Sequence, residues 1–124
     1  MLRVLFLILV LMSSIIFAQT VEKPKQNEMP KVSKTVEFGQ VSNGNIRYLM
    51  DRFLAEIYDN ATVQGYIISY GKTREVVRRE KILRSHINFR VFDVSRITFV
   101  RGSNKKEFVT EFWFVPQGAK PPTP

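Results

Sequence analysis

The chain has 124 residues, 44% of them hydrophobic, which is enough for one small domain with a modest core and too few for two. Nineteen Lys and Arg against eleven Asp and Glu give a formal net charge of +8, which favours anionic partners. There is no cysteine, which excludes disulfides, a thioether lipid anchor and cysteine-based zinc or thiol chemistry.

The first 18 residues predict export. Arg3 supplies a positive charge, residues 4–12 form an unbroken apolar run, and Ala18 is a small residue suited to cleavage. The uncharged run is shorter than the roughly 20 apolar residues that a membrane-spanning helix needs. We therefore expect a signal peptide over residues 1–18 and no transmembrane span in the mature chain, with an uncleaved anchor as the alternative. A cysteine-free exported domain is typical of the bacterial periplasm or extracellular space.

The two ends of the mature chain predict disorder. Residues 19–33 are polar, contain Pro24 and Pro30 and show no apolar period, which is the composition of a linker. Four prolines in residues 116–124 cannot join the interior of a sheet, so we expect a disordered tail over residues 117–124. The folded domain is then residues 34–116.

The domain opens with a predicted strand that places Val36 and Phe38 on one face. Residues 43–60 follow with apolar side chains at helical spacing, and Ser42 or Asn43 can cap the start of this helix. The expected buried face of the helix consists of Ile46, Leu49 or Met50, Phe53, Leu54 and Ile57.

Residues 62–71 form a short apolar run without alternation, which predicts a central strand covered on both faces. We expect Ile68 of this strand to be buried where Phe53 of the first helix meets the sheet. Residues 72–89 predict a second helix with Thr73 as its N-cap. Its apolar stripe is thin, and the expected core contacts are Val76, Val77, Leu83 and Ile87.

Two strands, residues 97–101 and 107–115, end the domain, and the polar link between them favours an antiparallel hairpin. Phe112 and Phe114 alternate with Trp113, so both faces of the last strand carry aromatic side chains. An exposed aromatic face would mark an interaction surface, although the ring of Trp113 can equally cover a core or an edge.

The predicted fold class is therefore an α/β (α+β) sandwich with a mixed four-stranded sheet. The elements follow in the order strand, helix, strand, helix, strand, strand, and both helices pack on one face of the sheet.

The second helix is rich in arginine, and its start is the candidate ligand-binding site. Arg74 and Arg78 share a helix face, while Glu75 and Arg79 are expected to pair at a spacing of four. Arginine forks suit carboxylates and phosphates, and backbone N–H groups at the helix start add to such a site. A solvated helix face is the alternative. The candidate residues are Lys72, Thr73, Arg74, Arg78 and Arg79.

Three motifs give the chain a family resemblance. Gly71 and Thr73 follow a hydrophobic strand, Arg79 lies in the next helix, and "DVSRI" (residues 93–97) leads into the following strand. This pattern resembles the outer-membrane protein A-like (OmpA-like) domain of bacterial envelopes over residues 46–115. The chain also resembles small exported bacterial proteins of unassigned function that share a Gly-Tyr-Ile-Ile strand and a closing Trp-x-Val-Pro.

The resemblance implies a ligand, but one residue of this chain departs from the family pattern. OmpA-like domains bind the diaminopimelate of peptidoglycan with an aspartate after the Gly-x-Thr motif and with the helix arginine, which corresponds to Arg79. Arg74 stands in the position of that aspartate and repels an ammonium group. The expected ligand is therefore a more purely anionic group than diaminopimelate.

Catalysis has little support in the sequence. His86 is the only histidine, and the chain shows no Ser-His-Asp order, no phosphate-cradling glycine loop and no metal-like spacing of acids. We expect a non-enzymatic module without metal or cofactor, and we expect His86 at the surface or its boundary. The first function is an envelope module that binds peptidoglycan or another anionic polymer. The alternative is a protein-interaction or structural module, while predicted export argues against nucleic acid as a partner.

Overall fold

The structure is a computed structural model that describes residues 31–103 and 107–124. In chain order the elements are β1 (Ser33–Phe38), α2 (Asn43–Asp59), β2 (Val63–Tyr70), α3 (Thr73–Phe89), the short 3-10 helix η1 (Val94–Arg96), β3 (Ile97–Arg101) and β4 (Val109–Pro116). The predicted signal peptide and most of the predicted linker lie outside the described residues. Of the helices in the described part, none is both long and apolar enough to cross a membrane.

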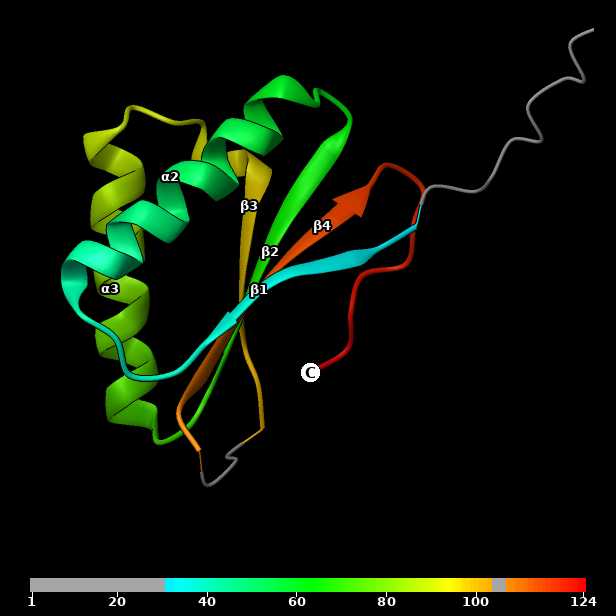
Figure 1. The fold of residues 1–124 in the computed structure, drawn as a ribbon. Coiled ribbons are helices and arrows are strands. Elements are labelled where there is room, and N and C mark those ends of the chain that lie inside the picture. The colour runs from blue at the N-terminus through cyan, green and yellow to red at the C-terminus, as the bar shows by residue number, and fades with distance from the viewer. Residues whose placement is uncertain (1–30, 104–106) are drawn as a thin grey trace, which may run out of the picture.

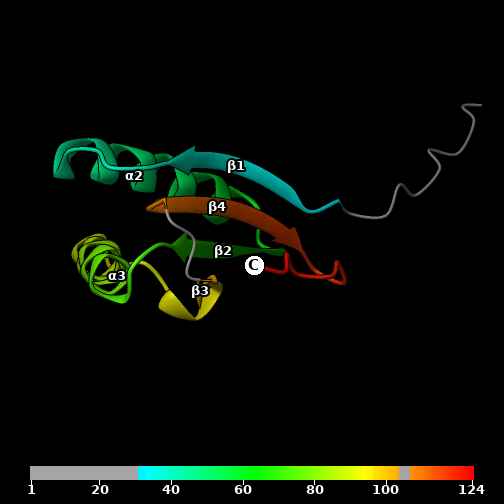
Figure 2. The same cartoon turned by 90° about the horizontal axis from the view of Figure 1, so that it is seen from below.

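One mixed sheet contains all four strands, in the order β1-β4-β2-β3 (Figure 2). β4 pairs antiparallel with β1 and with β2, while β2 and β3 are parallel. Both helices cover one face of this sheet, and the C-terminal end of the chain lies on the opposite side (Figure 1). The predicted α/β sandwich and its order of elements are confirmed.

The expected hairpin between the last two strands is wrong, because β2 lies between β3 and β4. The helical crossover through α3 places β3 parallel beside β2, as such connections do. β4 then pairs with β2 along its whole length, from Val109 opposite Tyr70 to Pro116 opposite Val63. Apolar side chains on both faces suit β4 to this inner position.

The core lies between the sheet and the two helices, and α2 contributes the larger apolar face. The buried face of α2 is Ile46, Met50, Phe53, Leu54 and Ile57, as predicted. Ser42 is its N-cap, with its Oγ accepting a hydrogen bond from the backbone N–H of Asn45. The Phe112 ring lies 4.7 Å from that of Phe53, and the Phe53 ring stacks on Phe114 at 5.2 Å between centroids.

Gly65 fixes which side of β2 faces α2. A Cβ atom at this position would lie 2.6 Å from Ile57 and 3.0 Å from Phe53, so only glycine allows the helix to come this close. Side chains alternate along a strand, so Ile67 shares the helix side with Gly65 and Ile68 faces the other way. Ile68 is fully buried as expected, but the predicted contact with Phe53 is wrong.

α3 buries a mixed stripe. Val76, Leu83 and Ile87 are buried as predicted, whereas Val77 is exposed and was assigned wrongly. Two polar side chains, Arg79 and His86, complete the buried stripe. The helix is capped by Lys72 and not by Thr73, and the Lys72 N–H donates to the Glu75 carboxylate at 3.3 Å.

Arg96 fastens the other end of α2. Its Nη2 donates to the carbonyl oxygens of Ile57, Asn60 and Val63 at 2.7, 2.7 and 2.8 Å. These carbonyls belong to the last turn of α2, the residue that follows it and the first residue of β2, and a cation is favourable at the C-terminal end of a helix. Residues 117–124 form no helix or strand, and their disorder stays a prediction.

Candidate functional site

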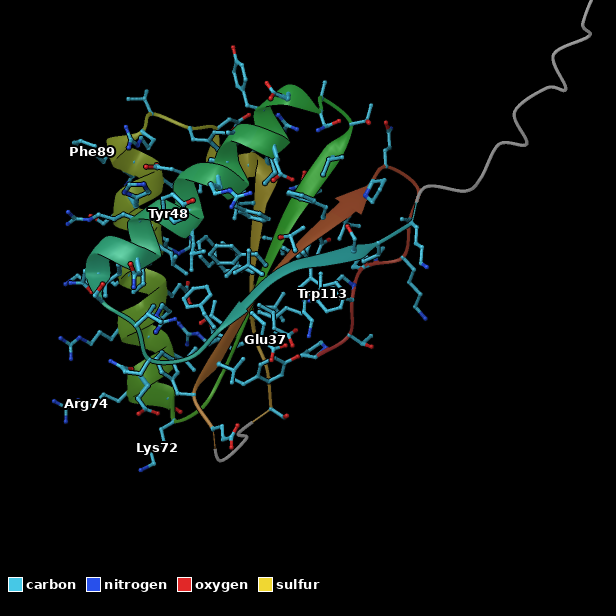
Figure 3. All side chains as sticks on the ribbon, viewed as in Figure 1. Glu37, Tyr48, Lys72, Arg74, Phe89 and Trp113 are labelled. Carbon is cyan, nitrogen blue, oxygen red and sulfur yellow. The ribbon has the colours of Figure 1, made fainter. Side chains whose placement is uncertain are left out.

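The five candidate residues do not lie together. Lys72, Thr73 and Arg74 are exposed at the start of α3, where Lys72 and Arg74 extend away from the body of the protein (Figure 3). Arg78 is also exposed but lies one turn further along the helix. Arg79 points inward and is only 3% exposed. The structure therefore separates a solvated helix start from an arginine in the interior.

Arg79 connects α3 to two strands. Its Nη1 donates to Thr110 Oγ1 of β4 at 3.1 Å, and its Nη2 donates to the carbonyl oxygen of Gly39 after β1 at 2.9 Å. The guanidinium carbon also lies 4.8 Å from the ring centroid of Phe38 and 4.4 Å from that of Phe108. The guanidinium is thus held between two aromatic rings and two hydrogen-bond acceptors.

Among the described residues, no carboxylate pairs with Arg79. The expected ion pair with Glu75 is absent there, because the Glu75 carboxylate accepts from the backbone of Lys72. Burial lowers the pKa of Arg79 to about 10, so the side chain stays cationic at neutral pH. Aromatic faces and neutral acceptors compensate part of the desolvation cost, but they supply no counter-charge.

A depression of about 270 Å³ has Arg79 in its lining. We call it the Arg79 depression; it is lined by Gln40, Val41, Asn43, Ile46, Glu75, Arg78, Arg79, Ile82 and Phe108. Arg78 and Arg79 contribute two cations to the lining, and Glu75 contributes one carboxylate. The depression therefore offers a site for a small anion above a buried cation.

A larger groove of about 720 Å³ runs between α2 and α3. We call it the helix groove; it is lined by Asn43, Arg47, Asp51, Arg78, Lys81, Ile82, Ser85, His86, Phe89 and Arg90. Asn43, Arg78 and Ile82 line both hollows, so the helix groove adjoins the Arg79 depression. Arg78 is the cation that the two sites share.

Most of the charge in the helix groove is positive. Its lining contains four cations, Arg47, Arg78, Lys81 and Arg90, and one carboxylate. That carboxylate, Asp51, accepts from Arg90 Nε at 2.8 Å and from Arg90 Nη2 at 2.6 Å. The other three cations form no ion pair with any residue of 31–103 or 107–124, so the groove is an electropositive channel.

His86 lies at the floor of the helix groove, where it is 6% exposed. The expected surface or boundary position is therefore wrong, because the ring takes a place in the buried stripe of α3. Its Nε2 lies 2.7 Å from Asp51 Oδ1. Hydrogen bonds from Arg90 and then from His86 hold the pKa of Asp51 below its usual value.

Sequence reasoning missed the contribution of α2 to the site. Arg47 and Asp51 are four residues apart and share a helix face, which was readable from the sequence. The sequence does not show that this face of α2 packs against α3. In the described part of the chain, no cluster of three His, Asp or Glu side chains is arranged to hold a metal ion.

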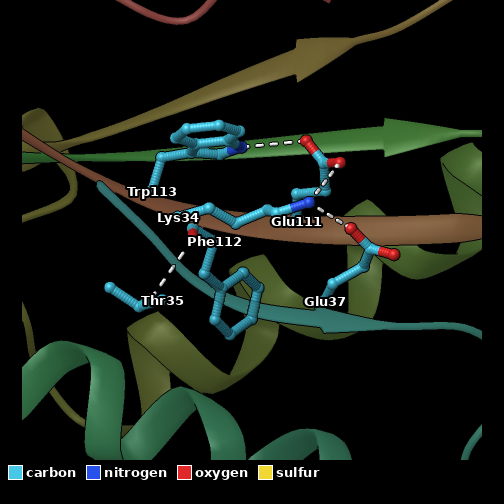
Figure 4. Close-up of polar contacts among 6 residues, drawn as sticks. All are labelled: Lys34, Thr35, Glu37, Glu111, Phe112 and Trp113. Carbon is cyan, nitrogen blue, oxygen red and sulfur yellow. Dashed lines mark hydrogen bonds and ion pairs between the residues drawn. The ribbon is translucent and has the colours of Figure 1, made fainter. Parts of the chain in front are cut away.

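The opposite face of the sheet carries a second polar cluster (Figure 4). Trp113 lies here, on the side of β4 away from Phe112, and its Nε1 donates to Glu111 at 2.9 Å. The Lys34 ammonium pairs with Glu37 and Glu111 and lies 5.8 Å from the centre of the Trp113 ring. Trp113 is half-buried, and its Nε1 is hydrogen-bonded to Glu111. This face is therefore not a fully exposed aromatic surface.

No protein-family model matches this chain, and no curated protein or solved structure is significantly similar to it.

Proposed function

We propose that this protein is an exported, non-enzymatic module of the bacterial cell envelope that binds peptidoglycan or another anionic envelope polymer. The observation that carries this proposal is Arg79, a buried cation with no carboxylate partner among the described residues, beside an open depression. An anionic group of the polymer enters the Arg79 depression and supplies the missing counter-charge.

The energetics of Arg79 support a binding role. A desolvated ion costs several kcal/mol, and structural arginines in interiors are usually paired with an acid. Hydrogen bonds to two neutral oxygens and contacts with Phe38 and Phe108 offset only part of this cost. The neighbours of Arg79 already orient its guanidinium. An incoming anion therefore adds a favourable electrostatic interaction without a further cost of ordering the side chain.

The ligand group follows from the charges around the depression. In the OmpA-like reading, Arg79 is the ligand-binding arginine, and Arg74 replaces the acid that holds an ammonium. Arg78 adds a second fork at the rim, so the favoured group is a carboxylate or phosphate without a neighbouring ammonium. Arg74 lines neither hollow and contributes only long-range attraction.

Arg78 and Arg74 provide a matched pair of variants to test this site. Both are exposed arginines on α3, four residues apart, and only Arg78 lines the Arg79 depression. We expect Arg78→Gln to lower retention of the exported chain on insoluble peptidoglycan about tenfold at moderate salt. Arg74→Gln, which removes the same charge, should change retention less than twofold.

Two results would contradict the proposal. Equal losses of retention in both variants would indicate general attraction by a basic helix. A larger loss of retention in Arg74→Gln would place the binding site at the start of α3. Retention on double-stranded DNA, measured in the same salt series, is the control for non-specific polyanion binding. Peptidoglycan should hold the chain at salt concentrations that release it from DNA.

The second candidate is a protein-interaction or structural module without a cell-wall ligand. The half-buried Trp113 on the sheet face away from the helices favours it, because tryptophan is enriched in protein interfaces. Under this alternative Arg78→Gln leaves peptidoglycan retention unchanged.

A further inference from the structure

The C-terminal end of α3 carries large apolar side chains in water. Phe89 is 74% exposed and Val91, two residues later, is 90% exposed. Figure 3 shows Phe89 at the end of α3 opposite to Lys72 and Arg74. Tyr58 of α2 is 76% exposed and lines an apolar depression together with Arg90 and Phe92. Phe89 and Val91 are two residues apart, so the end of α3 presents two exposed apolar side chains close together.

Val91 is held in a conformation that valine disfavours. Its φ is 54°, in the left-handed region that is costly for a β-branched residue. The geometry is a Schellman motif, in which the Phe92 N–H donates to Ile87 and the Val91 N–H donates to Asn88. Glycine is the usual residue at this place, so stability alone does not account for an exposed valine here.

Several basic residues line the same groove as Phe89. Phe89 and Arg90 form one end of the lining of the helix groove, and Arg47 and Lys81 line the same groove. Arg47 and Lys81 have no ion-pair partner in the described part of the chain. A surface that combines protruding apolar side chains with uncompensated basic residues is typical of proteins that lie on anionic membranes.

We propose that the C-terminal end of α3 docks, together with the helix groove, on an anionic lipid bilayer. Phe89 and Val91 enter the interface between headgroups and acyl chains, and the cations of the helix groove bind lipid phosphates. Charge complementarity selects an anionic bilayer as the occupant. A hydrophilic polymer would neutralise the cations but would leave Val91 in water, whereas a bilayer also removes apolar surface from water. This inference does not rest on the proposed binding of an envelope polymer.

The absence of cysteine allows a local test on the full chain. Val91→Cys creates a single attachment point for an environment-sensitive dye, and Gln117→Cys places the same dye on the exposed segment beyond the opposite face of the sheet. Vesicles of phosphatidylglycerol and phosphatidylcholine are compared with vesicles of phosphatidylcholine alone. A local dye is needed because the apolar residues 4–12 can themselves bring the chain to vesicles.

We expect the emission of the dye at position 91 to shift to the blue on anionic vesicles only, while the dye at position 117 does not respond. Arg47→Glu combined with Lys81→Glu should weaken the apparent affinity roughly twentyfold or more, since each basic residue near an anionic surface contributes about fivefold. Lys72→Glu combined with Lys120→Glu changes the net charge equally, away from the helix groove, and should weaken it far less.

Three results would overturn the inference. The dye at position 91 stays silent on anionic vesicles, the two double variants lose equal affinity, or soluble polyphosphate produces the same blue shift as the vesicles. The last result assigns this face to a polymer instead of a bilayer. Failure here leaves the peptidoglycan experiment with Arg78→Gln untouched, because that experiment tests the Arg79 depression.

Discussion

The two halves of α3 differ in how their charges are compensated. In the first half Arg74, Arg78 and Arg79 have no carboxylate partner among the described residues. In the second half Arg84 pairs with Glu80 at 2.9 Å, and Arg90, the C-cap of the helix, pairs with Asp51 at 2.6 Å. Arginines with and without a carboxylate partner occur along the same helix, so the presence of arginine alone does not mark a site. The absence of a counter-charge marks a candidate site, because an unpaired cation can bind an external anion.

Arg79 and Arg90 are the two arginines that represent this difference. Arg79 is buried between neutral acceptors and aromatic rings, whereas Arg90 is exposed and meets a carboxylate with two donors. The same substitutions should therefore have opposite rankings at the two positions. The predictions below go from the largest expected effect to the smallest.

At Arg79, lysine should be tolerated less well than methionine. Arg79→Lys keeps a buried charge but loses the fork that reaches Gly39 and Thr110, and we expect a loss of about 2–3 kcal/mol in the free energy of unfolding. Arg79→Met removes the desolvated charge and strands no carboxylate, so we expect a loss of only about 0–1 kcal/mol. Urea unfolding of both variants measures the difference.

Arg90 is the control for this ranking. Its partner Asp51 is a carboxylate, so Arg90→Lys should destabilise the protein less than Arg90→Met, and both effects should be small at this exposed pair. If Arg79 also prefers lysine to methionine, it has an anionic partner in the folded protein, and the contrast between the two halves of α3 fails.

The strained Val91, two residues after the end of α3, gives the next prediction. Val91→Gly should raise the free energy of unfolding by about 1 kcal/mol, because glycine adopts a φ of 54° without a steric penalty. Val77→Gly, at an exposed position inside the helix, should instead lower it by a few tenths of a kcal/mol. Thermal unfolding of both variants distinguishes the two signs. A destabilised Val91→Gly would show that the valine side chain itself contributes to the fold.

The smallest effect concerns Asp51 and low pH. The pKa of Asp51 is lowered in the folded protein by hydrogen bonds from Arg90 and His86, so its contribution is fully present above the usual aspartate pKa. That contribution is lost as the pH falls through the lowered pKa of the folded state. We expect Asp51→Asn to reduce stability by less than about 1 kcal/mol at pH 7, and the gap to the unchanged chain to close below about pH 4. A gap that widens in acid would contradict the pairing.

Local pattern was enough to predict the elements and most of the core. The buried face of α2 follows from helical spacing, and the placement of Phe112 and Trp113 on opposite faces follows from the alternation of side chains in β4. Both depend on side chains a few residues apart, whose relative directions are fixed by the backbone period. The class of the fold follows in turn from the order of these elements.

Tertiary structure alone decided which strands are neighbours and which charges are compensated. The sequence favoured a hairpin between β3 and β4, but β2 takes the place between them because pairing over long separations is not encoded in either strand by itself. Arg78 and Arg79 are adjacent in sequence, yet a turn of about 100° per helical residue exposes the first and buries the second. Asp51 meets Arg90 across 39 residues only because α2 and α3 pack side by side.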